Sequence, residues 1–241
     1  MIQAILFDLD DTLLGNHMDI FLPSYFALLG DHAAQYMPRD TFLKELMICT
    51  HAMVQNVDPT VSNRDVFWHC FERRTGLDTG EVETFFEQFY RNQFHQLEET
   101  TRKRPFAAKL IQHCQKAGLD VIIATNPLFP RTAIEARLAW AGLPVNEYDF
   151  ALVTTYENMH ATKPQPAYYA EILQKIDCAP ENVLMVGDDW GNDIVPAASL
   201  GIHTFWLASA DASPPTDLYT HRGASLQELH QLLAAGWQPV H

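Results

Sequence analysis

Residues 8–12 read Asp8-Leu9-Asp10-Asp11-Thr12, and they directly follow the first apolar run of the chain, residues 2–7. A short apolar run that ends in turn-forming residues is typical of a buried parallel strand. Two carboxylates two residues apart at the end of such a strand can be directed at one point in space. If a phosphoryl group and a magnesium ion occupy that point, one aspartate can attack phosphorus and the other can transfer a proton.

Apolar runs and helical patterns alternate along the rest of the chain. Runs similar to the first lie at residues 119–124, 150–153, 183–186 and 203–207. Helical patterns lie at residues 105–116, 130–141, 166–176, 194–200 and 226–235. This alternation predicts an α/β fold with a parallel sheet and right-handed crossovers, as in Rossmann-like proteins.

A long helical segment interrupts the alternation after the first run. A plain crossover takes roughly 30 residues or more, but the second strand is predicted only at residue 119. The intervening segment has helical patterns at residues 20–35, 39–55, 63–74 and 81–97, with no convincing strand between residues 16 and 104. We therefore predict a sheet domain formed by residues 1–16 and 105–241, and an inserted four-helix bundle formed by residues 17–104.

Composition excludes several classes of function. The 241 residues include 16 basic and 30 acidic side chains, giving a formal net charge of −14. Because a nucleic-acid binder needs a basic face, we expect no nucleic-acid partner. The four cysteines form no CxxC pair, which indicates reduced thiols rather than a zinc site or a disulfide framework. The sequence has no basic leader and no run of about 20 apolar residues, so we expect a cytoplasmic protein without membrane contact.

Polar clusters follow four of the predicted strand ends, where ligands of open α/β sheets bind. They are residues 8–12, Thr125-Asn126, residues 163–166 and residues 187–193. Each cluster alone is a weak signal. Together, and in this order, they resemble the DxDxT, Thr, KPxPxxY and GDD…ND motifs of the haloacid dehalogenase-like superfamily, whose members are mostly phosphatases. The resemblance covers residues 1–16 and 105–207, and the inserted helices resemble that family's helical cap.

The resemblance implies a role for each carboxylate. Asp8 is expected to attack phosphorus and form an aspartyl-phosphate, and Asp10 to protonate the leaving oxygen and then deprotonate the attacking water. Magnesium is expected on the Asp8 carboxylate, the Asp10 carbonyl and the Asp188 carboxylate. Asp193 is expected to hold metal-bound water and to cap the following helix as well. Asp189 either holds metal-bound water too or only lies in a solvated acidic turn.

Five other residues are candidates for phosphate or substrate binding. Thr125 can donate its hydroxyl to a phosphoryl oxygen, and Lys163 can place a positive charge there and keep Asp8 ionised. Thr12 belongs to the first motif and is expected beside the phosphate. Asn126 either shapes the site through its amide or only forms a turn, and His17 lies near the predicted hinge, where it could contact substrate.

The four motifs and the resemblance together imply a magnesium-dependent phosphatase that hydrolyses a small phosphorylated metabolite. A phosphomutase or another phosphotransferase would use the same motifs. A dehalogenase would keep Asp8 but need neither a metal nor Asp10. A non-enzymatic protein that binds a partner through the cap would be expected to lack Asp8 or Asp10. The sequence leaves open whether the protein is a monomer or a homodimer.

Overall fold

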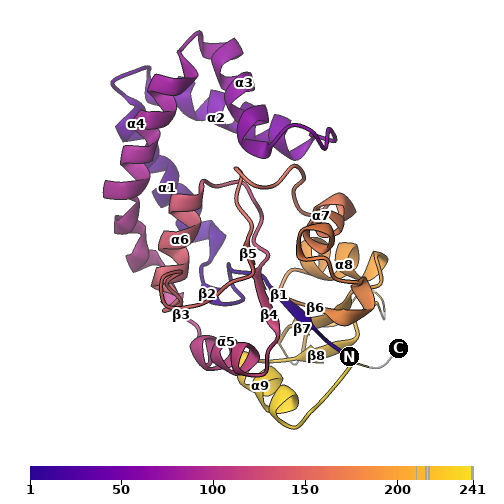
Figure 1. The fold of residues 1–241 in the computed structure, drawn as a ribbon. Coiled ribbons are helices and arrows are strands. Elements are labelled where there is room, and N and C mark those ends of the chain that lie inside the picture. Colours follow the sequence, from indigo (N-terminus) through magenta and orange to yellow (C-terminus); the bar gives the residue numbers. More distant parts are fainter. Residues whose placement is uncertain (210, 215, 217, 240–241) are drawn as a thin grey trace.

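A parallel sheet forms the centre of the protein. The computed structural model describes residues 1–209, 211–214, 216 and 218–239, so the predicted 105–241 segment includes five residues outside this description (Figure 1). In the described chain, six strands pair in the order β5-β4-β1-β6-β7-β8, all parallel. Their bounds are Ala4–Phe7 (β1), Asp120–Ile123 (β4), Leu152–Val153 (β5), Val183–Gly187 (β6), His203–Leu207 (β7) and His221–Gly223 (β8). The predicted Rossmann-like α/β class is confirmed.

Strand β1 lies in the middle of the sheet because all four of its side chains are apolar and buried. Successive side chains of a strand point to opposite faces, so Ile5 and Phe7 join one apolar core while Ala4 and Leu6 join the other. Phe7 pairs with Ile123 of β4 and with Val186 of β6. The residues that follow these three strands therefore emerge at the same edge of the sheet.

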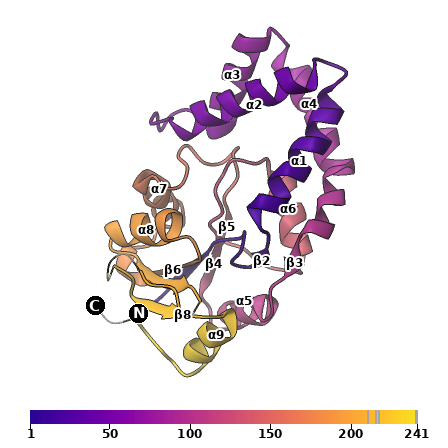
Figure 2. The same ribbon diagram turned by 180° about the vertical axis from the view of Figure 1, so that it is seen from behind.

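Helices cover both faces of the sheet, as Figures 1 and 2 show from opposite sides. The core that includes Ile5 and Phe7 also contains side chains of α5 (Ala107–Lys116), α6 (Arg131–Trp140) and α9 (Leu226–Ala234), and it continues into the helices inserted after β1. The other core contains side chains of α7 (Pro166–Ile176) and α8 (Val195–Ser199). Short helical turns cover Pro180–Asn182 and, as a π-helix, Trp190–Ile194.

A two-stranded antiparallel ribbon brackets the inserted helices. Strand β2 (Leu14–Gly15) pairs with β3 (Arg102–Lys103). The segment between them is described in full and contains α1 (Met18–Ala33), α2 (Arg39–Val54), α3 (Asn63–Thr75), α4 (Thr79–Asn92) and a 3-10 helix (Phe94–Thr100). The prediction of no strand between residues 16 and 104 is wrong for β3. Both residues of β3 are exposed and charged, so no apolar signal marks it.

Local signals explain where α3 begins and ends and where α4 begins. Ser62 caps α3 by accepting a hydrogen bond from the Asp65 amide at 3.1 Å, and Gly76 ends that helix with a φ of 72°. Asp78 caps α4 in the same way, through the Glu81 amide at 3.1 Å. The helices stand over the edge of the sheet where β1, β4 and β6 end (Figures 1 and 2).

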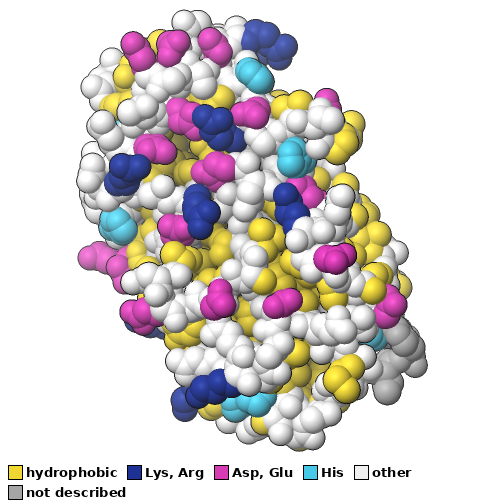
Figure 3. Space-filling model, viewed as in Figure 1, with side chains coloured by type: hydrophobic (Ala, Val, Ile, Leu, Met, Phe, Trp, Pro, Cys, Tyr) yellow, Lys and Arg dark blue, Asp and Glu magenta, His cyan; other side chains and the backbone are white. Residues whose placement is uncertain are grey.

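The surface agrees with the acidic composition. On the face drawn in Figure 3, basic side chains occur singly among acidic ones, without a basic patch. None of the helices in the described part of the chain has both the length and the hydropathy required to cross a bilayer.

Candidate active site

Three carboxylates meet where the central strands end. Asp8 follows β1, Asp188 follows β6, and Asp193 lies in the π-helix after Asp188. Each offers an oxygen that lies within 4.8 Å of an oxygen of the other two. Asp8 and Asp193 are buried. The parallel register thus brings together side chains that are 180 or more residues apart in the chain.

Lys163 lies between two of these carboxylates. Its Nζ donates to Oδ1 of Asp8 at 2.7 Å and to Oδ1 of Asp193 at 2.6 Å, and its side chain is 2% exposed. Burial alone would lower the pKa of Lys163, but the charges of Asp193 and Asp8 outweigh burial and raise its pKa well above the usual value. Lys163 is therefore a fixed positive charge beside Asp8.

Burial makes ionisation of the three carboxylates unfavourable and raises their pKa values. Burial raises the pKa of Asp8 to about 7, although Lys163 opposes the shift. Burial, followed by repulsion from Asp8, raises the pKa of Asp188 to about 7. Burial likewise raises the pKa of Asp193, against the effect of Lys163. Near neutral pH the cluster therefore gains from any further positive charge placed among its oxygens.

The cluster fits a divalent metal ion. Three carboxylates and one ammonium give a net charge of about −2 when all are ionised, and such a charge is costly in a buried site unless it is compensated. Oxygen donors of this kind suit hard cations such as Mg²⁺. Thr12 donates its hydroxyl to Oδ1 of Asp188 at 3.0 Å and so fixes the orientation of that carboxylate.

Asp10 points to different partners. Its Oδ1 accepts from Nδ2 of Asn16 at 2.8 Å, and its Oδ2 accepts from Nη1 of Arg137 at 2.6 Å. Arg137 comes from α6 and is 1% exposed, and its guanidinium lies 4.7 Å from the centre of the Phe129 ring. Neither Arg137 nor Asn16 was predicted from the sequence to bind Asp10. No signal in the sequence connects either residue to Asp10.

The loop after Asp10 is tied to the end of the helical insertion. Asp11 has a φ of 57°, a left-handed conformation that turns the chain sharply. Arg104 donates to the carbonyl of Asp11 at 2.8 Å and to its Oδ1 at 3.1 Å. His17 has a largely exposed side chain 3.6 Å from the Asp11 carboxylate. His17 and Thr12 line the same open groove as Asp188, which has a volume of about 690 Å³.

The other predicted residues occupy three different environments. Thr125 is buried, and its carbonyl accepts from Oγ1 of Thr154 and from the Tyr168 hydroxyl. Oδ1 of Asn126 accepts from the Lys163 amide at 3.2 Å, so Asn126 links the second and third motifs. Asp189 does not join the carboxylate cluster. Both of its oxygens bond to groups of the following turn, the amides of Gly191 and Asn192 and the Asn192 side chain, so Asp189 acts as a helix cap.

Comparison with known families agrees with this arrangement. The model of the haloacid dehalogenase-like hydrolase family matches residues 2–201. The chain therefore belongs to the haloacid dehalogenase-like hydrolases, as the order of the four motifs predicts.

Similar proteins include both phosphatases and dehalogenases. Pyrophosphatase PpaX of Bacillus cereus strain Q1 is 26% identical over 205 residues, which cover 84% of this chain and 82% of that protein. A 2-haloacid dehalogenase of Pseudomonas syringae pv. Tomato DC3000 has a similar structure, with a TM-score of 0.65, 22% identity and coverage of 98% and 100% of the two chains. A phosphatase of Thermococcus onnurineus gives a TM-score of 0.60 at 20% identity, with 99% and 100% coverage. The two structural similarities concern the fold alone.

Proposed function

We propose that this protein is a magnesium-dependent phosphatase that hydrolyses a phosphomonoester of a small metabolite through an aspartyl-phosphate on Asp8. The contact that carries the proposal is the 2.7 Å hydrogen bond from Lys163 to Asp8, within a cluster of three carboxylates. An anionic nucleophile must approach an anionic phosphate, so it needs positive charge at close range. Lys163 supplies one such charge.

The reaction has two displacements at phosphorus. In the first, an oxygen of Asp8 forms a bond to phosphorus while the bond to the leaving oxygen breaks, and protonated Asp10 gives its proton to that oxygen. In the second, the Asp10 carboxylate takes a proton from water as the water oxygen attacks phosphorus. Phosphate leaves and Asp8 is regenerated. Asn16 and Arg137 orient Asp10 in this scheme, and the Thr125 hydroxyl donates to a phosphoryl oxygen.

We assign the metal role to two members of the carboxylate cluster. Asp8 and Asp188, with the Asp10 carbonyl, would hold Mg²⁺, which neutralises charge on the phosphoryl group when bound. Asp193 holds Lys163 in place and would bind a metal-bound water. Asp189 is left out of this set because its oxygens cap the following turn.

We also propose that residues 17–104 act as a cap domain on a core of residues 1–16 and 105–241. The antiparallel pair β2 and β3 lies where the chain enters and leaves the helices, so this pair is the expected hinge. A cap in this place would exclude water during attack by Asp8 and contact the leaving group. His17, at the start of α1, is positioned to contact substrate from the open groove.

Pyrophosphate is the main alternative substrate, because the curated relatives carry the name pyrophosphatase. A phosphomutase would return the phosphoryl group to a second position of the substrate instead of releasing phosphate. Both alternatives use the same carboxylates and the same lysine. They differ from the proposal in the substrate accepted and the product released.

The proposal is tested by measuring phosphate release from a panel of phosphorylated metabolites and pyrophosphate, with Mg²⁺ and with a chelator. We expect release from at least one monoester, dependent on Mg²⁺ and lost in Asp8→Asn. Asp120→Asn is the matched control, because Asp120 is exposed and begins β4 at the opposite end of the sheet. Full activity of Asp8→Asn, or full activity in the chelator, would contradict the proposal.

A further inference from the structure

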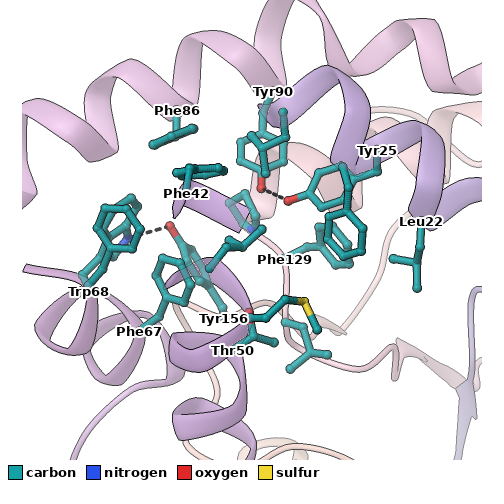
Figure 4. A pocket seen from close by; sticks show the side chains of 17 residues that line it. Leu22, Tyr25, Phe42, Thr50, Phe67, Trp68, Phe86, Tyr90, Phe129 and Tyr156 are labelled. Atoms are coloured by element: carbon teal, nitrogen blue, oxygen red, sulfur yellow. Dashed lines mark hydrogen bonds between the residues drawn. The ribbon is translucent and has the colours of Figure 1, made fainter. Parts of the chain in front are cut away.

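A cavity of about 230 Å³ lies between the inserted helices and the core, apart from the carboxylate cluster (Figure 4). Its walls come from α1, α2, α3 and α4, from the loop after β4 at residues 128–130, and from Tyr156 after β5. Ten of its 17 lining residues are aromatic. A cavity of roughly 150 Å³ in an apolar core is enough to bind benzene, so this one has room for a ring and its substituents.

The hydroxyls and the indole N–H of the aromatic residues in the cavity wall are already paired. The hydroxyls of Tyr25 and Tyr90 share a hydrogen bond of 2.7 Å. Nε1 of Trp68 donates to the Tyr156 hydroxyl at 3.3 Å, and that hydroxyl donates to Glu83 at 3.2 Å. Figure 4 shows both pairs spanning the cavity wall. The surface left for a ligand therefore consists mainly of aromatic faces and edges, which favour a flat apolar group.

One wall of the cavity adjoins the catalytic centre. Phe129 lines the cavity, and Arg137, which bonds to Asp10, lies over its ring at 4.7 Å. The loop that carries Phe129 begins at Thr125 and Asn126, the two residues expected near the phosphate. A group in the cavity would thus be separated only by the Phe129 ring from Arg137, which holds Asp10, the acid expected to protonate the leaving oxygen.

Arg137 itself has unused hydrogen-bonding capacity. Its Nε and Nη2 are buried and have no hydrogen-bond partner in the described structure. A buried donor without an acceptor is costly. The described protein atoms supply no acceptor for these donors, so a bound ligand oxygen beside Arg137 would satisfy them.

We propose that this cavity is the leaving-group site and that it takes an aromatic ring, so that the substrate is a phosphomonoester whose alcohol part carries an aryl group. This inference rests on the phosphatase function proposed above and narrows its substrate class. Inorganic pyrophosphate has no group that would fill the cavity, so the inference also separates this chain from the activity named for its relatives.

The test compares 2-phenylethyl phosphate with ethyl phosphate in the presence of Mg²⁺. Both are primary alkyl esters, so the chemical step is matched and only the ring differs. We expect kcat/KM to be at least about 30-fold higher for the phenylethyl ester, mostly through KM, because one apolar group in a fitted pocket gives discrimination of this order. A difference of less than about 3-fold would overturn the inference while leaving the phosphatase function in place.

A pair of identical substitutions locates the ring. Thr50 lines the cavity from α2, and Thr41 is exposed on the same helix outside it. Thr50→Phe fills the cavity and should reduce the preference for the phenylethyl ester to less than about 5-fold, whereas Thr41→Phe should retain it. Thermal melting of both variants verifies folding, and calorimetric titration of Asp8→Asn with 2-phenylethanol measures ring binding without turnover.

A preference for the phenylethyl ester that survives in folded Thr50→Phe overturns the inference. Failure to hydrolyse either ester or any metabolite of the panel overturns the proposed function, and this inference with it.

Discussion

Arg137 and Asp10 are 127 positions apart in the chain and lie 2.6 Å apart in the structure, Nη1 to Oδ2. The side chain of Arg137 is almost fully buried, and Phe129 supports its guanidinium from one side. Asn16 binds the other oxygen of Asp10. The carboxylate proposed as general acid and base is therefore held from two sides, by one residue of the β2–α1 connection and one of α6. This pair links the cavity wall to the reacting atoms.

Replacing Arg137 by glutamine should reduce kcat for an alkyl phosphate roughly 100-fold, with a smaller change in KM, because a misplaced Asp10 transfers protons poorly. The first turnover of 4-nitrophenyl phosphate should fall by less than about 5-fold, because nitrophenolate leaves without needing a proton. Steady-state assays measure the first value and rapid-quench assays the second.

The control for this prediction lies on the same helix. Arg131 pairs with Glu135 on the surface of α6, where the Arg131 side chain is 67% exposed. Arg131→Gln should leave both rates within about 2-fold, since exposed pairs of this kind contribute little. Equal losses on the two esters in Arg137→Gln would point to a role in folding alone and contradict its role in positioning Asp10.

The strands that the sequence predicted best are those buried on both faces. Apolar runs of four to six residues identified β1, β4, β6 and β7 within a few residues of their observed bounds. Strand β8 was missed, because its residues, His221–Gly223, have no apolar run at the edge of the sheet. Strands β2 and β3 also lack an apolar run. They form by pairing with each other and do not need both strands to be buried.

The site residues that belong to sequence motifs were predictable, whereas contacts that depend on tertiary packing were not. The convergence of Asp8, Lys163 and Asp188 follows from parallel strands that end at one edge of the sheet. The partnership of Asp10 with Arg137 does not, because an arginine in an amphipathic helix is usually solvent-exposed. Tertiary packing buries Arg137, whose guanidinium lies over Phe129 and bonds to Asp10.

Gly187 should not tolerate a side chain. A Cβ placed on it would lie 2.2 Å from Oδ2 of Asp193, which also accepts from the Asp189 amide at 3.1 Å. Asp193 would have to move and would release Lys163. We expect Gly187→Ala to lower kcat at least about 100-fold and to destabilise the fold by about 1–3 kcal/mol. Assay and denaturant unfolding measure the two effects.

Gly191 is the matched control for Gly187. It lies in the same motif, and a Cβ there would meet its nearest neighbour, Oδ1 of Asp189, at 3.5 Å, an ordinary contact distance. Gly191→Ala should therefore keep activity within about 3-fold. If Gly187→Ala behaves like Gly191→Ala, the tight packing around Asp193 is not needed for function.

Removing Lys163 should expose the charge imbalance of the site. Lys163→Met leaves Asp8 and Asp193 buried without their cation, which typically costs about 3–5 kcal/mol of stability. The double variant Lys163→Met, Asp193→Asn should recover part of this loss, because it removes one of the stranded charges. Lys175→Met, at a partly exposed pair with Glu171, serves as control and should change stability by less than about 1 kcal/mol. A double variant less stable than the single one would contradict the account.

The last prediction concerns pH and metal together. In the metal-free fold, burial raises the pKa of both Asp8 and Asp188 to about 7, from 3.8 for the ordinary side chain. Between these values the folded state binds protons that the unfolded state has released. The stability that proton binding by Asp8 and Asp188 adds to the fold is complete below about pH 4 and is lost as pH rises through about 7. A metal ion takes the place of these protons, so its apparent affinity should fall roughly 10-fold for each protonated ligand per unit of pH below 7.

Mg²⁺ should therefore raise the melting temperature by much more at pH 8 than at pH 5.5, measured against the same protein in a chelator at each pH. At each pH the melting temperature with Mg²⁺ is compared with that in the chelator. The titration of other carboxylates affects both samples equally and therefore cancels. Asp188→Asn removes one titrating ligand, and it should lose most of the Mg²⁺ effect at pH 8 while remaining folded. Asp120→Asn should retain the full effect. A stabilisation by Mg²⁺ that is equal at both pH values would mean that the ion binds elsewhere, because binding at Asp8 and Asp188 must displace their protons.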